Sequence, residues 1–203
     1  MLITRKKTVV FCILLVCIVF GWYAFKNLAL WLVVADPLPP SIDAIFTFAG
    51  ETNRLVYSKE LFGKYPGTQW LISYPSKKIA IPLRKDGFDI SRIQIVDSCK
   101  NTNSEAMFLV NWAVEKTRQS KKFSEQKPLQ IGLVSTPFHM RRIRLEIKRK
   151  TKDKAIRYYF LPVPYNKCGF TQNDYKYWWK NYVLKPAIIL ELKKYVYYFF
   201  KYW

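Results

Sequence analysis

The chain has 203 residues, half of them hydrophobic and 17% aromatic, a composition that excludes an intrinsically disordered protein. Its formal net charge is +20, from 34 basic and 14 acidic residues, and such a surface favours nucleic acid, anionic lipid headgroups or phosphorylated small molecules as partners. A compositional bias toward lysine explains the same charge equally well. The four cysteines form no C-x-x-C pair and the chain has one histidine, which argues against a zinc site, and we expect no metal site.

The N-terminal segment has the pattern of a membrane anchor. A basic flank precedes 18 uncharged, mostly apolar residues, 8–25, and a helix of this length spans about 27 Å, enough for a bilayer core. Trp22 and Tyr23 then lie at the far interface. Apolar character resumes over 28–35 and would extend the helix. A cleavable signal peptide is the alternative, but its apolar core is usually shorter, and only a weak cleavage site at Val33-Val34-Ala35 follows.

The charges that flank this segment predict its orientation. Arg5, Lys6 and Lys7 precede it, and basic residues are retained on the cytoplasmic side. We therefore expect a single-pass protein with its N-terminus inside and its main domain on the other side of the membrane; in a Gram-negative bacterial cell these are the inner membrane and the periplasm. This placement disfavours nucleic acid as a partner and leaves the lipid bilayer and anionic envelope metabolites.

The rest of the chain alternates short apolar runs with helical patterns. Residues 1–35 form the anchor, 36–42 a proline-rich linker and 43–203 one domain. The expected strands are 43–48, 69–73, 93–96, 130–135 and 156–161, and the expected helices are 54–62, 103–118 and 138–150. Such alternation predicts an α/β fold, a Rossmann-like parallel sheet of about five strands with helices on both faces. A further helix, with Pro186 in its first turn, runs to the C-terminus.

Polar residues follow the carboxyl ends of four expected strands, where ligands bind in such sheets. These candidate ligand-binding residues are Gly50, Glu51, Asn53 and Arg54 after the first strand, Ser73 after the second, Asn101, Thr102 and Glu105 after the third, and Ser135, Thr136, His139, Arg141 and Arg142 after the fourth. No nucleophile elbow, P-loop or H-E-x-x-H motif occurs, so the hydrolase, kinase and zincin classes lack support, and no motif identifies a cofactor.

Three of these stretches resemble a bacterial family of unknown function, the YdcF/SanA/ElyC-like family. "DPLPPSIDAIFTFAGETNR" is similar to the family's opening, "NTNSEA" to its N-T-x-x-E-A helix start, and "STPFHMRR" to its S-x-x-H-M-x-R signature. The resemblance covers roughly residues 36–165. It implies a Rossmann-like fold and a link to envelope biogenesis, without a settled reaction or cofactor.

The chain departs from the family where glycines are expected. After the first strand it has Ala49-Gly50 instead of two or three glycines, and after the second it has Ser73-Tyr74-Pro75. Fewer glycines reshape a loop that would otherwise cradle a phosphate.

His139 and Glu105 are the candidate catalytic residues. A neutral imidazole near a helix N-terminus suits proton transfer, whereas a surface or helix-capping role is the alternative. Arg141 and Arg142 point in different directions on a helix, and Arg142, which matches the family arginine, is the expected anion clamp. Thr102 and Glu105 form a T-x-x-E capping box, or else Thr102 meets an anion while Glu105 orients His139.

Two features outside this edge leave alternatives open. Residues 141–157 hold nine basic residues, which are either a solvated helix face or a contact with anionic lipid. The aromatic C-terminal helix, with Glu191 in a narrow polar stripe, either packs on the domain or lies at the membrane interface. Cys99 and Cys168 would pair only in an oxidising compartment.

The sequence therefore supports two functions. The first is a membrane-anchored envelope or cell-wall biogenesis factor whose α/β domain binds or processes an anionic, phosphorylated or lipid-linked intermediate. The second is a non-enzymatic, membrane-anchored binding or scaffold protein.

Overall fold

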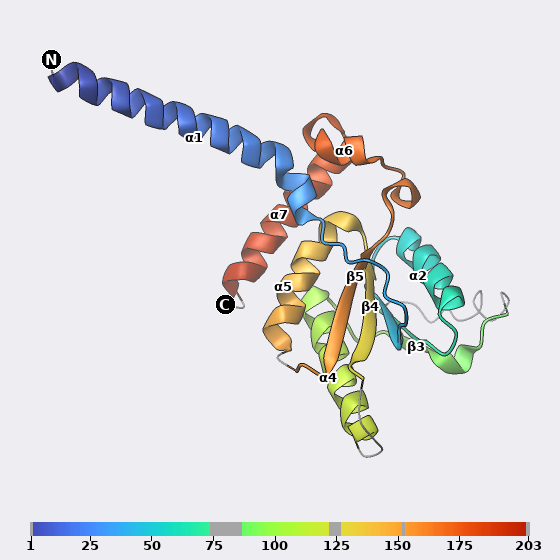
Figure 1. Cartoon of the computed structure of the whole chain (residues 1–203). Coiled ribbons are helices and arrows are strands. Elements are labelled where there is room, and N and C mark those ends of the chain that lie inside the picture. Colours follow the sequence, from blue (N-terminus) through green and yellow to red (C-terminus); the bar gives the residue numbers. More distant parts are fainter. Residues whose placement is uncertain (1, 74–86, 122–126, 152, 202–203) are drawn as a thin grey trace.

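A computed structural model describes residues 2–73, 87–121, 127–151 and 153–201 (Figure 1). The domain is built on a parallel sheet of five strands, as expected. The strands are β1 (Ala44–Thr47), β2 (Gln69–Ser73), β3 (Ile93–Val96), β4 (Leu129–Ser135) and β5 (Ile156–Pro162). Their order is β3-β2-β1-β4-β5, so the chain winds outward from β1 to β3 and then crosses back to β4. The strand order reverses between β1 and β4, which is the position where open α/β sheets bind ligands.

Helices cover both faces of the sheet, which confirms the α/β class. Helix α2 (Thr52–Lys64) packs on one face, where Ile45, Trp70 and Ile72 are fully buried. Helices α4 (Thr102–Lys121) and α5 (Met140–Lys150) pack on the other face, around Phe46 and Leu133. Side chains of successive residues of β1 thus pack on opposite faces of the sheet, as is typical of parallel strands that are buried on both faces.

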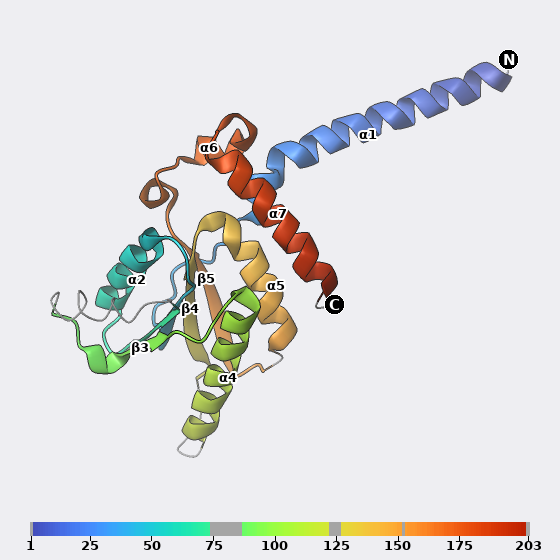
Figure 2. The same ribbon diagram turned by 180° about the vertical axis from the view of Figure 1, so that it is seen from behind.

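Helix α1 (Leu2–Leu32) is one continuous helix that projects from the domain (Figures 1 and 2). Within the described residues, its segment Phe11–Leu32 is the one helix long and apolar enough to cross a membrane, with a mean hydropathy of 1.9. The side chains from Phe11 to Phe25 are exposed, whereas Ala29 and Leu32 are fully buried against the domain. The expected extension of the anchor beyond residue 25 is therefore helical, and it belongs to the folded domain.

An aromatic cluster surrounds the point where α1 meets the domain. We call Trp22, Phe25, Trp178 and Trp179 the aromatic collar; the last two lie in the short 3-10 helix η5 (Trp178–Lys180). The ring centroids of Trp22 and Trp179 are 6.0 Å apart, those of Phe25 and Trp178 are 4.9 Å apart, and Trp178 Nε1 donates to the Phe25 carbonyl at 3.1 Å. The collar therefore joins the exposed part of α1 to the C-terminal third of the chain.

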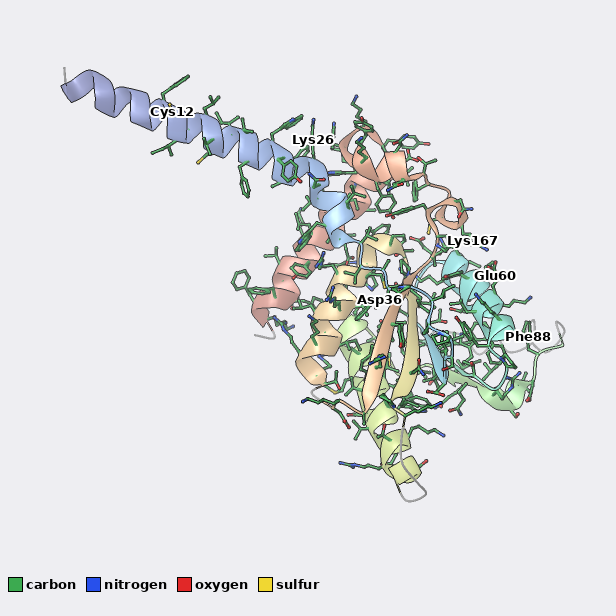
Figure 3. The ribbon with its side chains drawn as sticks, viewed as in Figure 1. Cys12, Lys26, Asp36, Glu60, Phe88 and Lys167 are labelled. Carbon is green, nitrogen blue, oxygen red and sulfur yellow. The ribbon has the colours of Figure 1, made fainter. Side chains whose placement is uncertain are left out.

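The proline-rich stretch 36–42 is held on the domain by hydrogen bonds. The Asp36 backbone N–H donates to the Phe160 carbonyl, and the Phe160 N–H donates to Asp36 Oδ2, both at 2.8 Å, so Asp36 sits beside β5 (Figure 3). Tyr65 Oη donates to the Pro39 carbonyl at 2.8 Å, and Ile42 is buried. This stretch thus fixes the path from α1 to β1.

The chain after β5 returns to α1. It forms the 3-10 helix η4 (Tyr165–Cys168), helix α6 (Gln172–Lys176) and η5, and ends in α7 (Leu184–Lys201). Leu184 and Ile188 of α7 pack with Leu32 of α1 in one apolar cluster. Arg149 of α5 donates to the carbonyls of residues 198 and 199 near the C-terminal end of α7. The last helix thus packs on the domain, and the four cysteines, including Cys99 and Cys168, are free thiols.

We predict that Leu32→Ala destabilises the whole domain. Leu32 has no exposed surface, and deleting a buried leucine side chain costs about 2–5 kcal/mol. Denaturant unfolding in detergent micelles measures the loss. The matched control is Leu14→Ala, at a position 56% exposed on the same helix, which should leave the transition unchanged. Equal effects of the two substitutions would contradict the packing of α1 on the domain.

Candidate functional site

A pocket of about 640 Å³ opens at the carboxyl edge of the sheet, where the strand order reverses. Its wall is formed by the turn after β1, by residues 99–102 at the start of α4, by the 3-10 helix η3 (Pro137–His139) with the first turn of α5, and by one face of α7. Four segments far apart in the chain therefore meet at the edge that the strand pattern indicates.

Most of the expected site residues lie in this wall. The pocket-lining residues among them are Gly50, Glu51, Arg54, Asn101, Thr102, Glu105, His139 and Arg142. The other five do not line it. Ser73, Ser135 and Thr136 are buried beside the strand ends, Asn53 donates from Nδ2 to Glu51 Oε2 at 3.1 Å, and Arg141 is described below. Tyr74 and Pro75, where the family glycines are missing, lie outside the described residues.

The N-terminus of α4 is capped differently from the T-x-x-E expectation. Asn101 Oδ1 accepts from the Ser104 backbone N–H at 3.0 Å, and Ser104 Oγ accepts from the Asn101 N–H at 3.1 Å. Asn101 is therefore the N-cap and Ser104 its reciprocal partner. Because this pair satisfies the helix end, Thr102 and Glu105 are free to turn toward the pocket.

Glu105 supports the turn after β1 and does not contact His139. Its Oε1 accepts from the Ala49 backbone N–H at 2.7 Å. Burial raises the pKa of the Glu105 carboxyl, although this hydrogen bond acts to lower that pKa. The orienting role that we expected for Glu105 belongs to another residue.

Arg54 lies under the same turn. It donates to the Ala49 carbonyl and, from Nη2, to Thr136 Oγ1 at 3.0 Å, and it makes no ion pair with Glu51. A Cβ on Gly50, whose φ is +144°, would stand 2.7 Å from Arg54 Cζ. Glycine is needed here both for the backbone conformation and for the space that the guanidinium occupies. Arg54 therefore shapes the pocket wall through the backbone.

A buried polar network forms the floor of the pocket. Arg142 donates from Nε to Glu191 Oε1 at 2.6 Å and from Nη1 to Thr102 Oγ1 at 2.5 Å. His139 Nδ1 lies 3.1 Å from Glu191 Oε1, and His139 Nε2 lies 3.3 Å from Thr102 Oγ1. All four residues are at most 6% exposed. A carboxylate, an imidazole, a hydroxyl and a guanidinium are thus held together away from water.

Arg142 and Glu191 favour opposite tautomers of the neutral imidazole. Arg142 Nη2 lies 2.7 Å from His139 Nδ1 and can only donate, whereas Glu191 Oε1 lies 3.1 Å from the same nitrogen and can only accept. With its proton on Nε2, the ring accepts from Arg142 through Nδ1. With its proton on Nδ1, it donates to Glu191, and Nε2 then faces Thr102 Oγ1 as an acceptor.

Burial and charge set the ionisation of the network. Burial, together with the positive charge of Arg142, lowers the pKa of His139 to about 4. Burial acts to raise the pKa of Glu191, but its contacts with His139 and Arg142 outweigh it and lower that pKa to about 2. At neutral pH the network therefore holds one carboxylate, one guanidinium and a neutral imidazole.

Glu191 is the site residue that the sequence did not reveal. It is the one acid of α7 and appeared there as part of a polar stripe on a surface helix. The signal was the spacing of that stripe, because Glu191, Lys194 and Tyr198 lie on one helix face and all three line the pocket. A single acid on an otherwise basic and apolar helix was a further hint that it has a buried cationic partner.

Arg141 lies outside the site, as expected for the neighbour of Arg142. Its Nε donates to the Trp31 carbonyl near the C-terminal end of α1 at 2.7 Å, and its guanidinium stacks over the Trp31 ring. The two adjacent arginines therefore bind two different helices, Arg141 binding α1 and Arg142 binding α7.

No protein-family model, no curated protein and no solved structure matches the chain. The fold and the geometry of this site are therefore the observations from which a function is argued.

We predict that His139 stays neutral down to about pH 5. It is the only histidine of the chain, so the ring of a ¹⁵N-histidine-labelled sample gives one pair of nitrogen resonances. These should show a neutral ring at pH 7 and titrate near pH 4. The pKa of His139 in the folded protein lies below its value in the unfolded chain. The free energy of unfolding is therefore highest above pH 6.5 and decreases by up to about 3 kcal/mol as the pH falls toward 4. A titration near pH 6.5 would refute the buried network.

We predict that Glu191→Gln destabilises the domain by about 3–5 kcal/mol, because it leaves Arg142 buried without a counter-charge. Lys194→Gln, one turn further along the same helix at an exposed position, is the matched control and should change stability by less than about 0.5 kcal/mol. Urea denaturation of both variants provides the comparison. A loss for Glu191→Gln no larger than that of the control would show that the ion pair is not formed.

Proposed function

We propose that the protein is a membrane-anchored factor of envelope or cell-wall biogenesis, whose α/β domain binds an anionic intermediate, phosphorylated or lipid-linked, in the pocket between the ends of β1 and β4. The observation that carries the proposal is the buried group of Arg142, His139, Glu191 and Thr102 on the pocket floor. The resemblance of "STPFHMRR" to the signature of the YdcF/SanA/ElyC-like family supports the assignment to the envelope.

The mouth of the pocket favours an anion. Lys100 and Lys194 are exposed in its wall, Lys100 next to the start of α4 and Lys194 on α7. The N-terminus of α4, a helix of 20 residues, is directed at the same space and adds a partial positive charge. A phosphate group would meet these groups before it reaches Arg142 on the floor.

An anion that draws Arg142 away from the imidazole changes the chemistry of the floor. Once Nη2 leaves Nδ1, the ring can move its proton to Nδ1 and donate to Glu191 Oε1, only 3.1 Å away. Nε2 then becomes an acceptor facing Thr102 Oγ1. This is the order carboxylate, imidazole, hydroxyl that makes a hydroxyl a proton donor or nucleophile in other proteins. His139 is therefore our candidate for proton transfer, with Arg142 as the anion clamp that releases it.

A non-enzymatic binding or scaffold function is the second candidate. The observation that favours it is that both buried arginines already have partners: Arg142 is bound to Glu191, and Arg54 to backbone carbonyls and Thr136. A domain with such satisfied cations could bind a ligand at the mouth alone, through Lys100 and Lys194, without a reaction.

The proposal places the domain outside the cytoplasm. It rests on the apolar helix Phe11–Leu32 and on the basic residues 5–7 that precede it in the sequence. A reporter enzyme fused to the C-terminus, active only in the periplasm, tests this orientation; activity of a reporter that requires the cytoplasm would reverse it.

We predict that native mass spectrometry of the protein from its own membrane shows an anionic ligand that Arg142→Lys loses. Lysine keeps the charge but not the paired donors of the guanidinium. Arg141→Lys, the adjacent residue outside the pocket, is the matched control and should retain the ligand.

His139→Ala separates the two candidate functions. If it retains the ligand but fails to complement a deletion strain, the site is catalytic. Full complementation by both His139→Ala and Arg142→Lys would contradict the first function and favour the scaffold.

A further inference from the structure

Helix α7 exposes a third face that serves neither the core nor the pocket. We call Lys185, Ile189, Lys193, Val196 and Phe200 the docking face. At 3.6 residues per turn they lie within about 80° of the helix circumference. All five are exposed, and Phe200 is 74% exposed. None of them lines the pocket. A strip of apolar side chains and lysines thus faces solvent, whereas Leu184 and Ile188 on another face of the same helix pack in the core.

The charge of this face has one sign. Helix α7 contains four lysines and one acid, and that acid, Glu191, is 4% exposed and bound to Arg142. The outward surface of α7 therefore carries only positive charge among apolar and aromatic side chains. This is the composition of helices that lie in the headgroup region of anionic bilayers, with lysines at headgroup level and apolar side chains below them.

The position of α7 relative to α1 brings this face to a membrane. The aromatic collar joins Trp22 and Phe25 of α1 to η5, directly before α7, and tryptophans gather at the membrane interface. Lys26 follows in the chain, with its Nζ 5.1 Å from the centre of the Trp22 ring (Figure 3). The Trp31 and Tyr195 rings, 5.1 Å apart, hold α1 against α7. In Figures 1 and 2, α7 forms the flank of the domain on the side toward which α1 projects, and the sheet and α2 lie beyond it.

We infer that the docking face rests on the anionic lipid surface of the bilayer that α1 crosses. The two elements then act together: α1 fixes the domain to the membrane, and α7 lies along its surface. The proposal requires α1 to be a membrane span, as argued under the proposed function.

Docking in this way places the pocket at headgroup level. Leu190 and Tyr197 line the pocket and are also about half exposed, so they form a rim between the pocket and the docking face. A ligand that reaches the site across this rim is a lipid that carries a phosphate or another anion. This assignment of a ligand class rests on the proposed function, whereas the docking of α7 does not.

Spin-label accessibility on the full chain in lipid nanodiscs tests the docking. The four free cysteines are replaced by serine, and a label is attached at Val196→Cys on the docking face or at Lys64→Cys on α2. In nanodiscs that contain phosphatidylglycerol, we expect the label at 196 to be reached by oxygen and not by a water-soluble nickel chelate. The label at 64 should show the reverse. Equal access of the chelate to both labels would overturn the proposal, and protection of 196 from both reagents, as a second protein copy would produce, would overturn it as well.

Charge reversal tests the electrostatic part. Lys185→Glu with Lys193→Glu should return the label at 196 to water, because each lysine contributes roughly fivefold to association with an anionic surface. Lys64→Glu with Arg118→Glu makes the same change of charge on α2 and α4 and should leave the label immersed. In nanodiscs of phosphatidylcholine alone, both double variants should behave alike. Immersion that persists after reversal on α7 would contradict an anionic-lipid surface.

The two proposals fail separately. If the label at 196 is immersed but no ligand is lost in Arg142→Lys, the docking holds and the binding function is wrong. If the ligand is lost in Arg142→Lys and the label at 196 is in water, the pocket binds its ligand without the membrane contact.

Discussion

The structure depends on one buried carboxylate. Glu191 brings a negative charge from the last helix into the cluster of positive charge at the carboxyl edge of the sheet, where it meets Arg142 at 2.6 Å and His139 at 3.1 Å. A buried charge without a partner costs several kcal/mol, so the positive charge of Arg142 and the negative charge of Glu191 stabilise each other at this depth. The helix that carries Glu191 is therefore part of the site, and the site residues are part of what holds the helix.

The same constraint ties α1 to the site. Arg141 and Arg142 are adjacent, and one binds the end of α1 while the other binds α7. Much of the basic run 141–157 works in this way: Arg149 binds the last turns of α7, and Lys150 donates to Asn103 and Glu146. Four of the nine basic residues of a run that resembles a solvated helix face thus join helices inside the protein.

The sequence allowed the sheet and most of the pocket to be predicted, because both follow from local patterns. The buried strands and the 3.6-residue periodicity of α4 and α5 are visible in the residues, and the rule for parallel sheets then brings Gly50, Thr102 and His139 to one edge. The partners within the pocket could not be predicted in this way. Thr102 and Glu105 have the spacing of a capping box, but Asn101 and Ser104 cap the helix. Glu191 lies 52 residues from His139, and only the packing of α7 brings them together.

Helix α7 has three faces with different contacts, and these contacts restrict its rotation about its own axis. Its core face packs on α1, its pocket face holds Glu191 to Arg142, and its third face carries lysines and apolar side chains outward. A rotation by one residue, about 100°, would replace Glu191 by Leu190 or Leu192 at the floor of the pocket and leave Arg142 without a counter-charge. The ion pair therefore fixes which face of α7 points outward, and the arrangement that neutralises the pocket floor is the same one that presents the lysines on the side of α1.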